Sequence, residues 1–256
     1  MNFSHLGRAM RASLREVAGS RNFCLAVILC FIALFAELVP IFSANTGEYG
    51  DAYYFNISLH FGYYIYAAPL VCAFASGDVF CSDWEAGFYR LRLIKCGRRE
   101  YQCGLWLGTT LGGGLALFLG VSLFGAACAV LFGPQRPAEV IMTVDGWLPV
   151  LQGPNGNLSY MLANALLALL FGMVWSGAGL FFSLLSPNRA TSYLMPFILC
   201  FCGAIFLPAS LRPLEMLVQM SWQDFHFPRL IAYQTALYAA FAAGCLWISD
   251  RRLFHE

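Results

Sequence analysis

"DWEAGFYRLRLIKCGRREY", residues 83–101, is the stretch that decides the fold, because it is charged and lies between two long apolar runs. From Arg90 to Arg99 it holds five of the 15 lysines and arginines of the chain. Apolar runs of about 20 residues are long enough to cross a bilayer, and loops on the inner side of a membrane collect positive charge. The stretch therefore predicts an inner loop between two membrane-spanning helices.

The composition predicts a membrane protein with several spans. Hydrophobic residues make up 59% of the 256 residues and charged residues only 11%, whereas a soluble domain carries about 25% charged residues. The runs long and apolar enough to span a bilayer are 23–43, 61–80, 103–133, 158–185, 190–209 and 229–248. We expect an all-α membrane protein with six transmembrane helices. The net charge of +1 does not favour nucleic acid as a partner.

The positive charges also predict the orientation of the chain. If both termini are cytoplasmic, 12 of the 15 lysines and arginines lie in inner flanks, and only Arg136, Arg212 and Arg229 lie outside. The apolar run after Arg21 is longer than the core of a signal peptide, so we expect it to be retained as the first span. The prediction is a multi-pass protein of the cell membrane, of the bacterial inner-membrane kind.

The first 22 residues predict an amphipathic helix ahead of the spans. Their apolar positions recur at steps of three and four: Phe3, Leu6, Met10, Leu14 and Val17. Such a helix lies in the headgroup layer with its apolar side down; the alternative is a solvated tail. The chain is then a single transmembrane domain, 1–256, with the interfacial helix at 1–22, the six-span bundle at 23–248 and a cytoplasmic tail at 249–256.

The third and fourth spans carry small residues at every fourth position. The positions are Gly104, Gly108, Gly112, Ala116 and Gly120 in the third span and Ala168, Gly172 and Ser176 in the fourth. Small residues at this spacing allow two helices to approach closely. We expect these spans to pack on each other or across a dimer. The glycines lie inside apolar runs, and no Gly-Lys-Ser/Thr follows, so they do not form a phosphate-binding loop.

The charged stretch itself has a helical pattern from Asp83 to Cys96, with Gly97 placed to end it. One side of this predicted helix is apolar, and its residues are Trp84, Phe88, Leu91 and Ile94. Another side is polar, and its residues are Glu85, Tyr89, Arg92 and Lys95. We expect a short helix on the inner membrane surface. It serves either as a positively charged lipid anchor or as a docking helix for a cytosolic protein.

Against this background the chain resembles the membrane subunit of ABC exporters of the type 2 permease family. The inner loop is similar in having Glu85, Gly87, "FYRLRLI" and then "GRREY" at 97–101, and "SLLSPNRATSYLMP" at 183–196 resembles the turn between spans four and five. The chain departs from the family where Lys95-Cys96 stands in place of a proline and where "CGLWLG" lacks a lysine. The resemblance covers nearly the whole chain through its topology.

The resemblance implies an ATP-driven exporter in which this chain binds no cofactor and hydrolyses nothing. It has no Walker motif, so ATP and Mg would be bound by a separate cytosolic ABC ATPase, and two permease copies, identical or different, would form the path. The inner helix at 83–97 would be the coupling helix, with Trp84, Phe88 and Leu91 as its buried side. The residues expected to couple the ATPase are Trp84, Glu85, Gly87, Tyr89, Arg90, Arg92 and Arg99.

Three other functions compete with this expectation. An intramembrane enzyme is disfavoured, because none of the four histidines lies in a predicted span and no HExxH motif exists; we predict no catalytic or metal-binding residue. A secondary transporter or channel needs charges within the membrane, and Glu37 is its main candidate, although near the outer end it could also reach water. The third is a non-transporting immunity or sensor protein. The apolar spans favour an amphipathic peptide or a lipid-like substrate.

Overall fold

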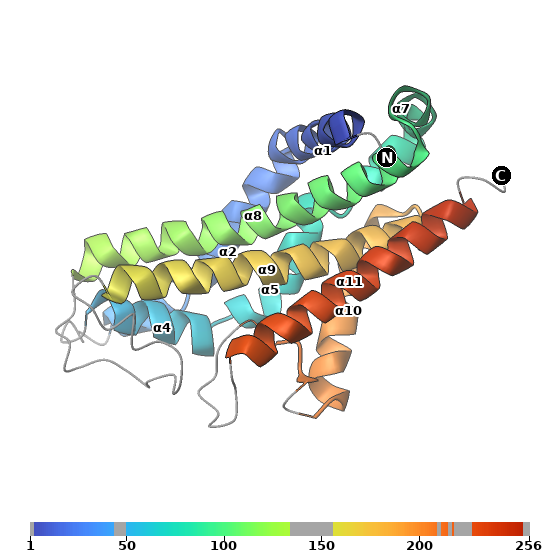
Figure 1. Ribbon diagram of the computed structural model, residues 1–256. Coiled ribbons are helices and arrows are strands. Elements are labelled where there is room, and N and C mark those ends of the chain that lie inside the picture. The colour runs from blue at the N-terminus through green and yellow to red at the C-terminus, as the bar shows by residue number, and fades with distance from the viewer. Residues whose placement is uncertain are drawn as a thin grey trace.

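The computed structural model describes residues 3–43, 50–133, 156–208, 211–214, 217 and 227–252, and over these residues the chain is helical and contains no strand. The helices are α1 (Phe3–Ala18), α2 (Arg21–Phe35), α3 (Leu38–Ser43), α4 (Asp51–Phe61), α5 (Tyr64–Ser76), α6 (Val79–Glu85), α7 (Phe88–Cys96), α8 (Arg98–Phe132), α9 (Gly156–Leu185), α10 (Arg189–Phe206) and α11 (Phe227–Arg252) (Figure 1). The predicted outer segments at 134–155 and 218–226 lie outside the described residues.

Within the described residues, six helical segments are long and apolar enough to cross a membrane, which agrees with the six predicted spans. They are Arg21–Pro40, Tyr64–Glu85, Arg98–Phe132, Leu158–Leu185, Arg189–Phe206 and Pro228–Arg251. Large apolar side chains stand exposed on the outer faces of α2 and α10, among them Ile28, Ile32 and Ile198. Water would disfavour such surfaces, whereas a bilayer solvates them. The chain therefore has the build of a multi-pass membrane protein.

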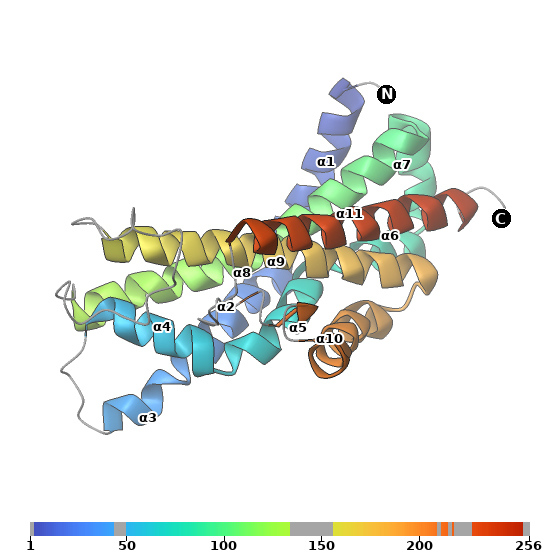
Figure 2. The ribbon, with the colours of Figure 1, turned by 60° about the horizontal axis from the view of Figure 1, so that its bottom comes forward.

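The long helices α8 and α9 pack closely at the centre of the bundle, and the other helices surround them (Figures 1 and 2). The approach depends on glycine: a Cβ added to Gly172 would lie 2.8 Å from the Gly114 Cα. At one end of the bundle α7 stands beside the start of α1 and the end of α11 (Figure 2). We call this the α7 end.

A further helix precedes the second crossing. Residues 51–60, which lie ahead of the predicted second span, form α4, which packs beside α8 and α9 at the end of the bundle opposite α7 (Figure 2). The Asp51 amide donates to the Gly133 carbonyl over 3.0 Å, so α4 starts beside the end of α8. Tyr54 and Phe55 are fully buried. Tyr54 stacks on Phe132 of α8 at a centroid distance of 3.9 Å, and Phe55 stacks on Phe124 of α8 at 5.9 Å. These aromatics pack in the core and do not form a membrane-interface belt.

The helices α1 and α2 pack closely against the small residues of α8. A Cβ added to Gly104 or Gly108 would lie 2.5 Å from the Cβ of Ala9 or Ser13, and one on Gly112 would meet Val17. Farther along the helix, a Cβ on Gly120 would lie 2.6 Å from the Cys30 Cβ of α2. Residues 3–18 are helical as predicted, but the face of α1 with Ala9, Ser13 and Val17 is buried against α8. The first helix is therefore part of the packed bundle.

Replacing Gly108 with leucine is expected to separate α1 from α8. The new side chain would overlap Ser13 and the backbone of α1, and an overpacked contact of this kind costs about 1–3 kcal/mol or more. Trypsin should then cleave faster at Arg8, Arg11 and Arg15. The matched control is Gly7→Leu, because a Cβ at Gly7 meets nothing within 4 Å. Equal cleavage rates in the two variants would contradict this packing.

Two apolar cores follow one another along the bundle. The larger lies among α2, α4, α5, α8 and α9 and includes Phe55, Phe124 and Phe171. The smaller lies at the α7 end, where Phe80, Leu105 and Leu184 pack together with residues of α1 and α11. The smaller core holds the start of α8 and the end of α9 in place, and the charged stretch 83–101 folds over it.

Candidate functional site

The charged stretch forms two helices that meet at a glycine. The prediction of one helix from Asp83 to Cys96 is wrong: α6 ends at Glu85 and α7 begins at Phe88. Gly87 between them has φ +69°, the left-handed region that favours glycine. Gly97, at φ +82°, ends α7 where the sequence places the stop, and α8 starts from the next residue.

The turn at Gly87 can be tested with two substitutions. Gly87→Val should destabilise the protein by about 1–3 kcal/mol, because a β-branched residue is strained at positive φ. Gly87→Asn should have a smaller effect, because asparagine adopts this conformation more readily. Thermal unfolding in detergent compares the two variants. A Cβ at this position meets nothing within 4 Å, so a loss of stability that occurs only in the valine variant reflects strain in the backbone and not a steric clash. Equal stability of the two variants would show that the turn is not left-handed.

The turn at Gly87 separates the predicted apolar side of this segment into two parts. Trp84 of α6 stacks on Tyr89 at a centroid distance of 4.8 Å, and both rings pack against the smaller core. On α7, Phe88, Leu91 and Ile94 point outward and are 54%, 55% and 82% exposed. Of the predicted polar side, Tyr89 and the half-buried Arg92 face inward, whereas Glu85 and Lys95 are exposed. The structure therefore presents an apolar stripe, Phe88–Leu91–Ile94, at the surface of the α7 end.

Arg92 joins α7 to two other helices, and a third helix contacts one of its partners. Its Nη2 donates to Glu16 Oε2 of α1 over 2.6 Å, and its Nη1 lies 3.0 Å from Asp83 Oδ2 of α6, as an ion pair without hydrogen-bond alignment. The Tyr101 hydroxyl of α8 donates to the same Asp83 oxygen over 3.2 Å. Asp83 is only 1% exposed, so its charge depends on these partners.

The guanidinium of Arg92 keeps its charge at this half-buried position. Burial is the largest single influence and lowers its pKa, but the hydrogen bond to Glu16 and the negative charge of Asp83 raise it, and the pKa lies above the ordinary value of arginine. A buried carboxylate that loses its cation costs about 3–5 kcal/mol. Arg92 therefore fixes the position of α7 against α1 and α6.

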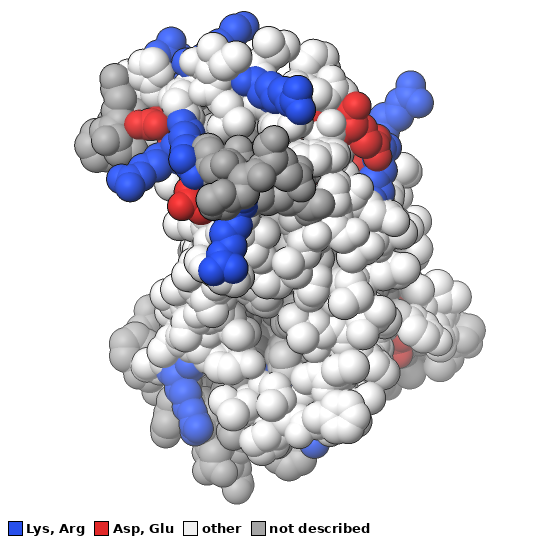
Figure 3. Space-filling view, turned by 90° about the vertical axis from the view of Figure 1, so that its right-hand side faces the viewer, with Lys and Arg blue, Asp and Glu red and all other residues white. Residues whose placement is uncertain are grey.

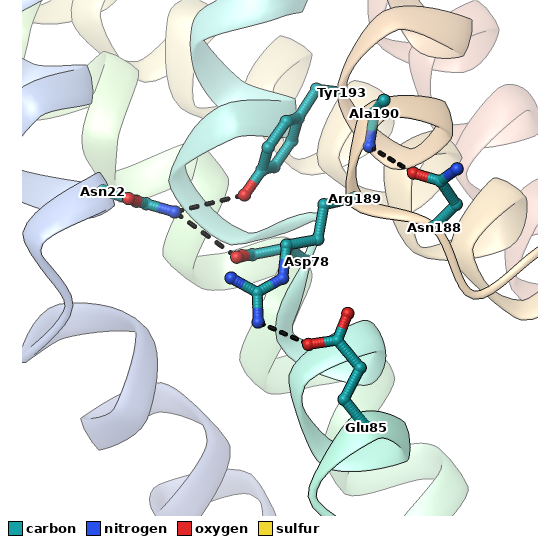
Figure 4. A network of polar contacts seen from close by, with 7 residues as sticks. All are labelled: Asn22, Asp78, Glu85, Asn188, Arg189, Ala190 and Tyr193. Carbon is teal, nitrogen blue, oxygen red and sulfur yellow. Dashed lines mark hydrogen bonds and ion pairs between the residues drawn. The ribbon is translucent and has the colours of Figure 1, made fainter.

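A second polar cluster ties the other side of α6 to α10 and α2 (Figure 4). Arg189 at the start of α10 donates to Glu85 over 2.6 Å, and the Asn22 amide donates to Asp78 over 3.3 Å and to the Tyr193 hydroxyl over 3.2 Å. Figure 4 shows the Tyr193 ring directed toward Asn22 and Asp78. Because α6 carries Asp83 to one side and Glu85 to the other, it links α7 with α10.

Asparagine and proline define the turn before α10. Asn188 accepts from the Ala190 amide over 2.9 Å and so caps the helix. This capped start places Arg189 beside Glu85 (Figure 4). The predicted "SPNRA" connection between the fourth and fifth spans is found at the α7 end, where it contributes a partner to α6.

The remaining predicted site residues lie apart from these clusters. Arg90 is exposed and donates to the neighbouring Tyr89 hydroxyl over 2.9 Å. Arg99 and Lys95 are exposed, and within the described residues no hydrogen bond or ion pair contacts them. Glu37 is half-buried where α2 gives way to α3, with its Cβ 3.6 Å from the position of a Gly62 Cβ. The structure therefore groups Trp84, Glu85, Tyr89 and Arg92 and leaves Glu37 in the other half of the bundle.

Sequence reasoning missed Glu16, Asp83 and Tyr101 as members of the site. A signal for Glu16 was present, since it is the only acidic residue among the arginines of 3–18.

Positive charge surrounds the assembled site: Figure 3, which looks onto the α7 end, shows Lys and Arg side chains gathered mostly in the upper half of the view. Exposed Arg8, Arg11 and Arg15 lie on one face of α1.

In the part of the chain that the structure describes, no three histidine, cysteine, aspartate or glutamate side chains converge as metal ligands. The arrangement presents an exposed apolar stripe on a helix that ion pairs hold against the bundle.

Comparison with protein-family models, with curated proteins and with solved structures finds no match for this chain.

Proposed function

We propose that this chain is the membrane-spanning subunit of an ATP-driven ABC exporter and that α7 couples it to a separate cytosolic ATPase. The observation that carries the proposal is the exposed stripe Phe88–Leu91–Ile94 at the end where lysines and arginines gather. By the positive-inside rule that end is cytoplasmic. Three large apolar side chains directed toward the cytosol favour a protein partner over solvent.

The surroundings of the stripe favour a partner with an apolar groove and acidic edges. Arg90 and Lys95 flank the stripe on α7, and Arg99 follows at the start of α8. Apolar contact supplies affinity, whereas charges at the rim steer association and orient the partner. A helix laid into such a groove is a common mode of protein recognition. ATP and Mg would be bound by that partner, and this chain would contribute no catalytic group.

The ion pairs link α7 to other helices, so in our proposal they transmit a movement of α7 to the membrane spans. Arg92 connects α7 to Asp83 of α6 and Glu16 of α1, and Glu85 of α6 connects to Arg189 of α10. A partner that pushes α7 on ATP binding would therefore displace α1, α6 and α10 together. In our proposal two copies of the chain, or this chain and a related one, enclose the path for an amphipathic peptide or lipid-like substrate across the bacterial inner membrane.

The proposal is tested by searching the genes beside that of this chain for an ABC ATPase and co-expressing the two proteins. We expect the two proteins to purify together and ATP turnover to rise when the substrate is added. Transport into inside-out vesicles that requires ATP then separates an exporter from an immunity or sensor protein that only binds a peptide. The exporter hypothesis would be rejected if the two proteins do not purify together and transport does not require ATP.

A secondary transporter or channel is the second candidate, and the position of Glu37 favours it. Glu37 lies where α2 gives way to α3, beside Gly62, where α4 gives way to α5. In secondary transporters, breaks in membrane helices surround substrate and ion sites. In this case transport would follow an ion gradient without ATP, and Glu37→Gln would abolish it. Glu37→Gln would leave ATP-driven export largely intact.

A further inference from the structure

The first turns of α8 extend beyond the membrane-spanning part of the bundle at the α7 end. The helix has 35 residues and is about 52 Å long, whereas the hydrocarbon core of a bilayer is about 30 Å thick. The first span begins at Arg21 of α2. Just before this span, Val17 packs on Gly112 of α8, and farther along α2, Cys30 packs on Gly120. On this side of the bundle, the part of α8 ahead of Gly112 therefore lies outside the hydrocarbon core.

The end of α11 gives a second marker of the membrane surface. Trp247 is 58% exposed, and Arg251 lies over its ring at 4.2 Å. An exposed tryptophan beside an arginine at the end of a span is typical of the headgroup layer. The neighbouring Leu246 borders the same small depression as Gln102 of α8. The headgroup layer therefore lies beside the stretch of α8 between Gln102 and Gly112.

The helix α1 lies against this stretch of α8 and carries arginines on its other face. Its buried residues pack on α8 from Gly104 to Gly112. On the opposite face, Arg8, Arg11 and Arg15 are exposed, and their spacings of four and three residues place them on one side of the helix. The three arginines therefore face outward at the depth of the lipid headgroups. We call them the arginine face of α1.

Within the described residues, no carboxylate neutralises the arginine face of α1. The only acidic residue of the helix, Glu16, is paired with Arg92 of α7. No ion pair involves the three arginines in the part of the chain that the structure describes, and Arg8 donates to the Ser4 carbonyl of its own helix over 3.4 Å. Guanidinium groups bind phosphate oxygens through several donors at once. This face therefore fits a layer of phosphate groups.

We propose that the arginine face of α1 binds the phosphates of anionic phospholipids in the cytoplasmic leaflet. An acidic protein surface would match the same charge. The depth of the face favours lipid, because a cytosolic protein that approaches the α7 end meets α7 and the start of α8 first. Lipid on one face of α1 and α8 on the other would hold this helix at the membrane surface. The inference does not depend on the proposed export function.

The test measures which lipid the purified full chain retains. The protein is exchanged into detergent with equal amounts of phosphatidylglycerol and phosphatidylcholine that carry the same acyl chains, and native mass spectrometry counts the bound lipids. We expect the wild type to retain phosphatidylglycerol in preference. A basic residue at the membrane surface contributes about 1 kcal/mol, or about fivefold in affinity. Replacing Arg8, Arg11 and Arg15 with glutamine should therefore weaken the preference about 100-fold.

The matched control replaces Arg90, Lys95 and Arg99 with glutamine. It removes the same charge from exposed positions at the same end, but from α7 and the first turn of α8, which lie beyond the headgroup layer. This variant should keep the preference for phosphatidylglycerol. A wash in about 1 M salt should remove phosphatidylglycerol from the wild type, because the Debye length is then only about 3 Å.

Three results would overturn the proposal. Equal loss of preference in the two triple variants would show that net charge alone attracts the lipid. Retention that the salt wash leaves unchanged would exclude an electrostatic contact. If the variant of the arginine face retains as much phosphatidylglycerol as the wild type, lipid is not its partner. Loss of co-purification with an ATPase in that same variant would then make the face a protein-docking surface.

Discussion

Replacing Arg92 with glutamate is expected to release α7 from the bundle and to uncouple ATP hydrolysis from transport. The substitution removes the cation shared by Glu16 and Asp83 and adds a third carboxylate beside them. Because Asp83 is buried, the free energy of unfolding should fall by about 3–5 kcal/mol. Thermal unfolding in detergent measures the first effect, and ATP turnover with and without substrate measures the second.

The matched control for the stability part of this prediction is Arg90→Glu. It makes the same charge change on the same helix, but Arg90 is exposed, and among the described residues its polar contact is with the neighbouring Tyr89. Pairing Arg92→Gln with Asp83→Asn should recover much of the stability that Arg92→Gln alone removes, because no buried carboxylate is then left without a cation. Equal effects of the Arg90 and Arg92 substitutions would show that the ion pairs do not hold α7.

If α7 is the docking helix that we propose, substituting Leu91 and Ile94 with serine is expected to abolish binding of the partner ATPase while leaving the free protein stable. Both side chains are exposed, so their loss removes little packing within the chain. A central apolar contact in a protein interface is often worth 2 kcal/mol or more, so the loss of two should weaken binding about 100-fold or more. Co-purification and ATPase stimulation are the measurements.

The matched control for the stripe is Val130→Ser at the other end of α8. Val130 is as exposed as Ile94, but it lies far from α7. It should bind the ATPase as the wild type does. If the Leu91 and Ile94 variant also binds normally, the stripe is not the docking surface, and the lipid-anchor interpretation of α7 gains support.

The spans could be predicted from the sequence because crossing a membrane is a local property. A run of about 20 apolar residues predicts a helix wherever its neighbours lie. The packing of α4 is not a local property: the aromatics of 51–61 suit a membrane interface as well as a buried core, and only contacts such as Tyr54 with Phe132 decide between the two. The glycines of α8 likewise predict that another helix packs closely against α8, but they do not indicate that this helix is α1.

The candidate site was only partly predictable, because its geometry depends on distant residues. Arg92 and Glu16 are 76 positions apart in the chain, and a single sequence carries no sign that they meet. A lone glycine within a helical pattern is tolerated or marks a break, so Gly87 could not be assigned before its backbone was known. With that turn in place, Phe88, Leu91 and Ile94 are exposed while Trp84 packs inward, so the predicted apolar side is divided.

The contrast between α8 and the second crossing has a consequence for stiffness. The helix α8 continues for 35 residues without a break, a length of about 52 Å, whereas the crossing beside it is divided into α5 and α6 by a junction at Gly77. An unbroken helix transmits a force along its whole length, whereas a divided one bends at its junction. A partner that displaced α7 would therefore move the far end of α8 with it and would bend the second crossing at Gly77.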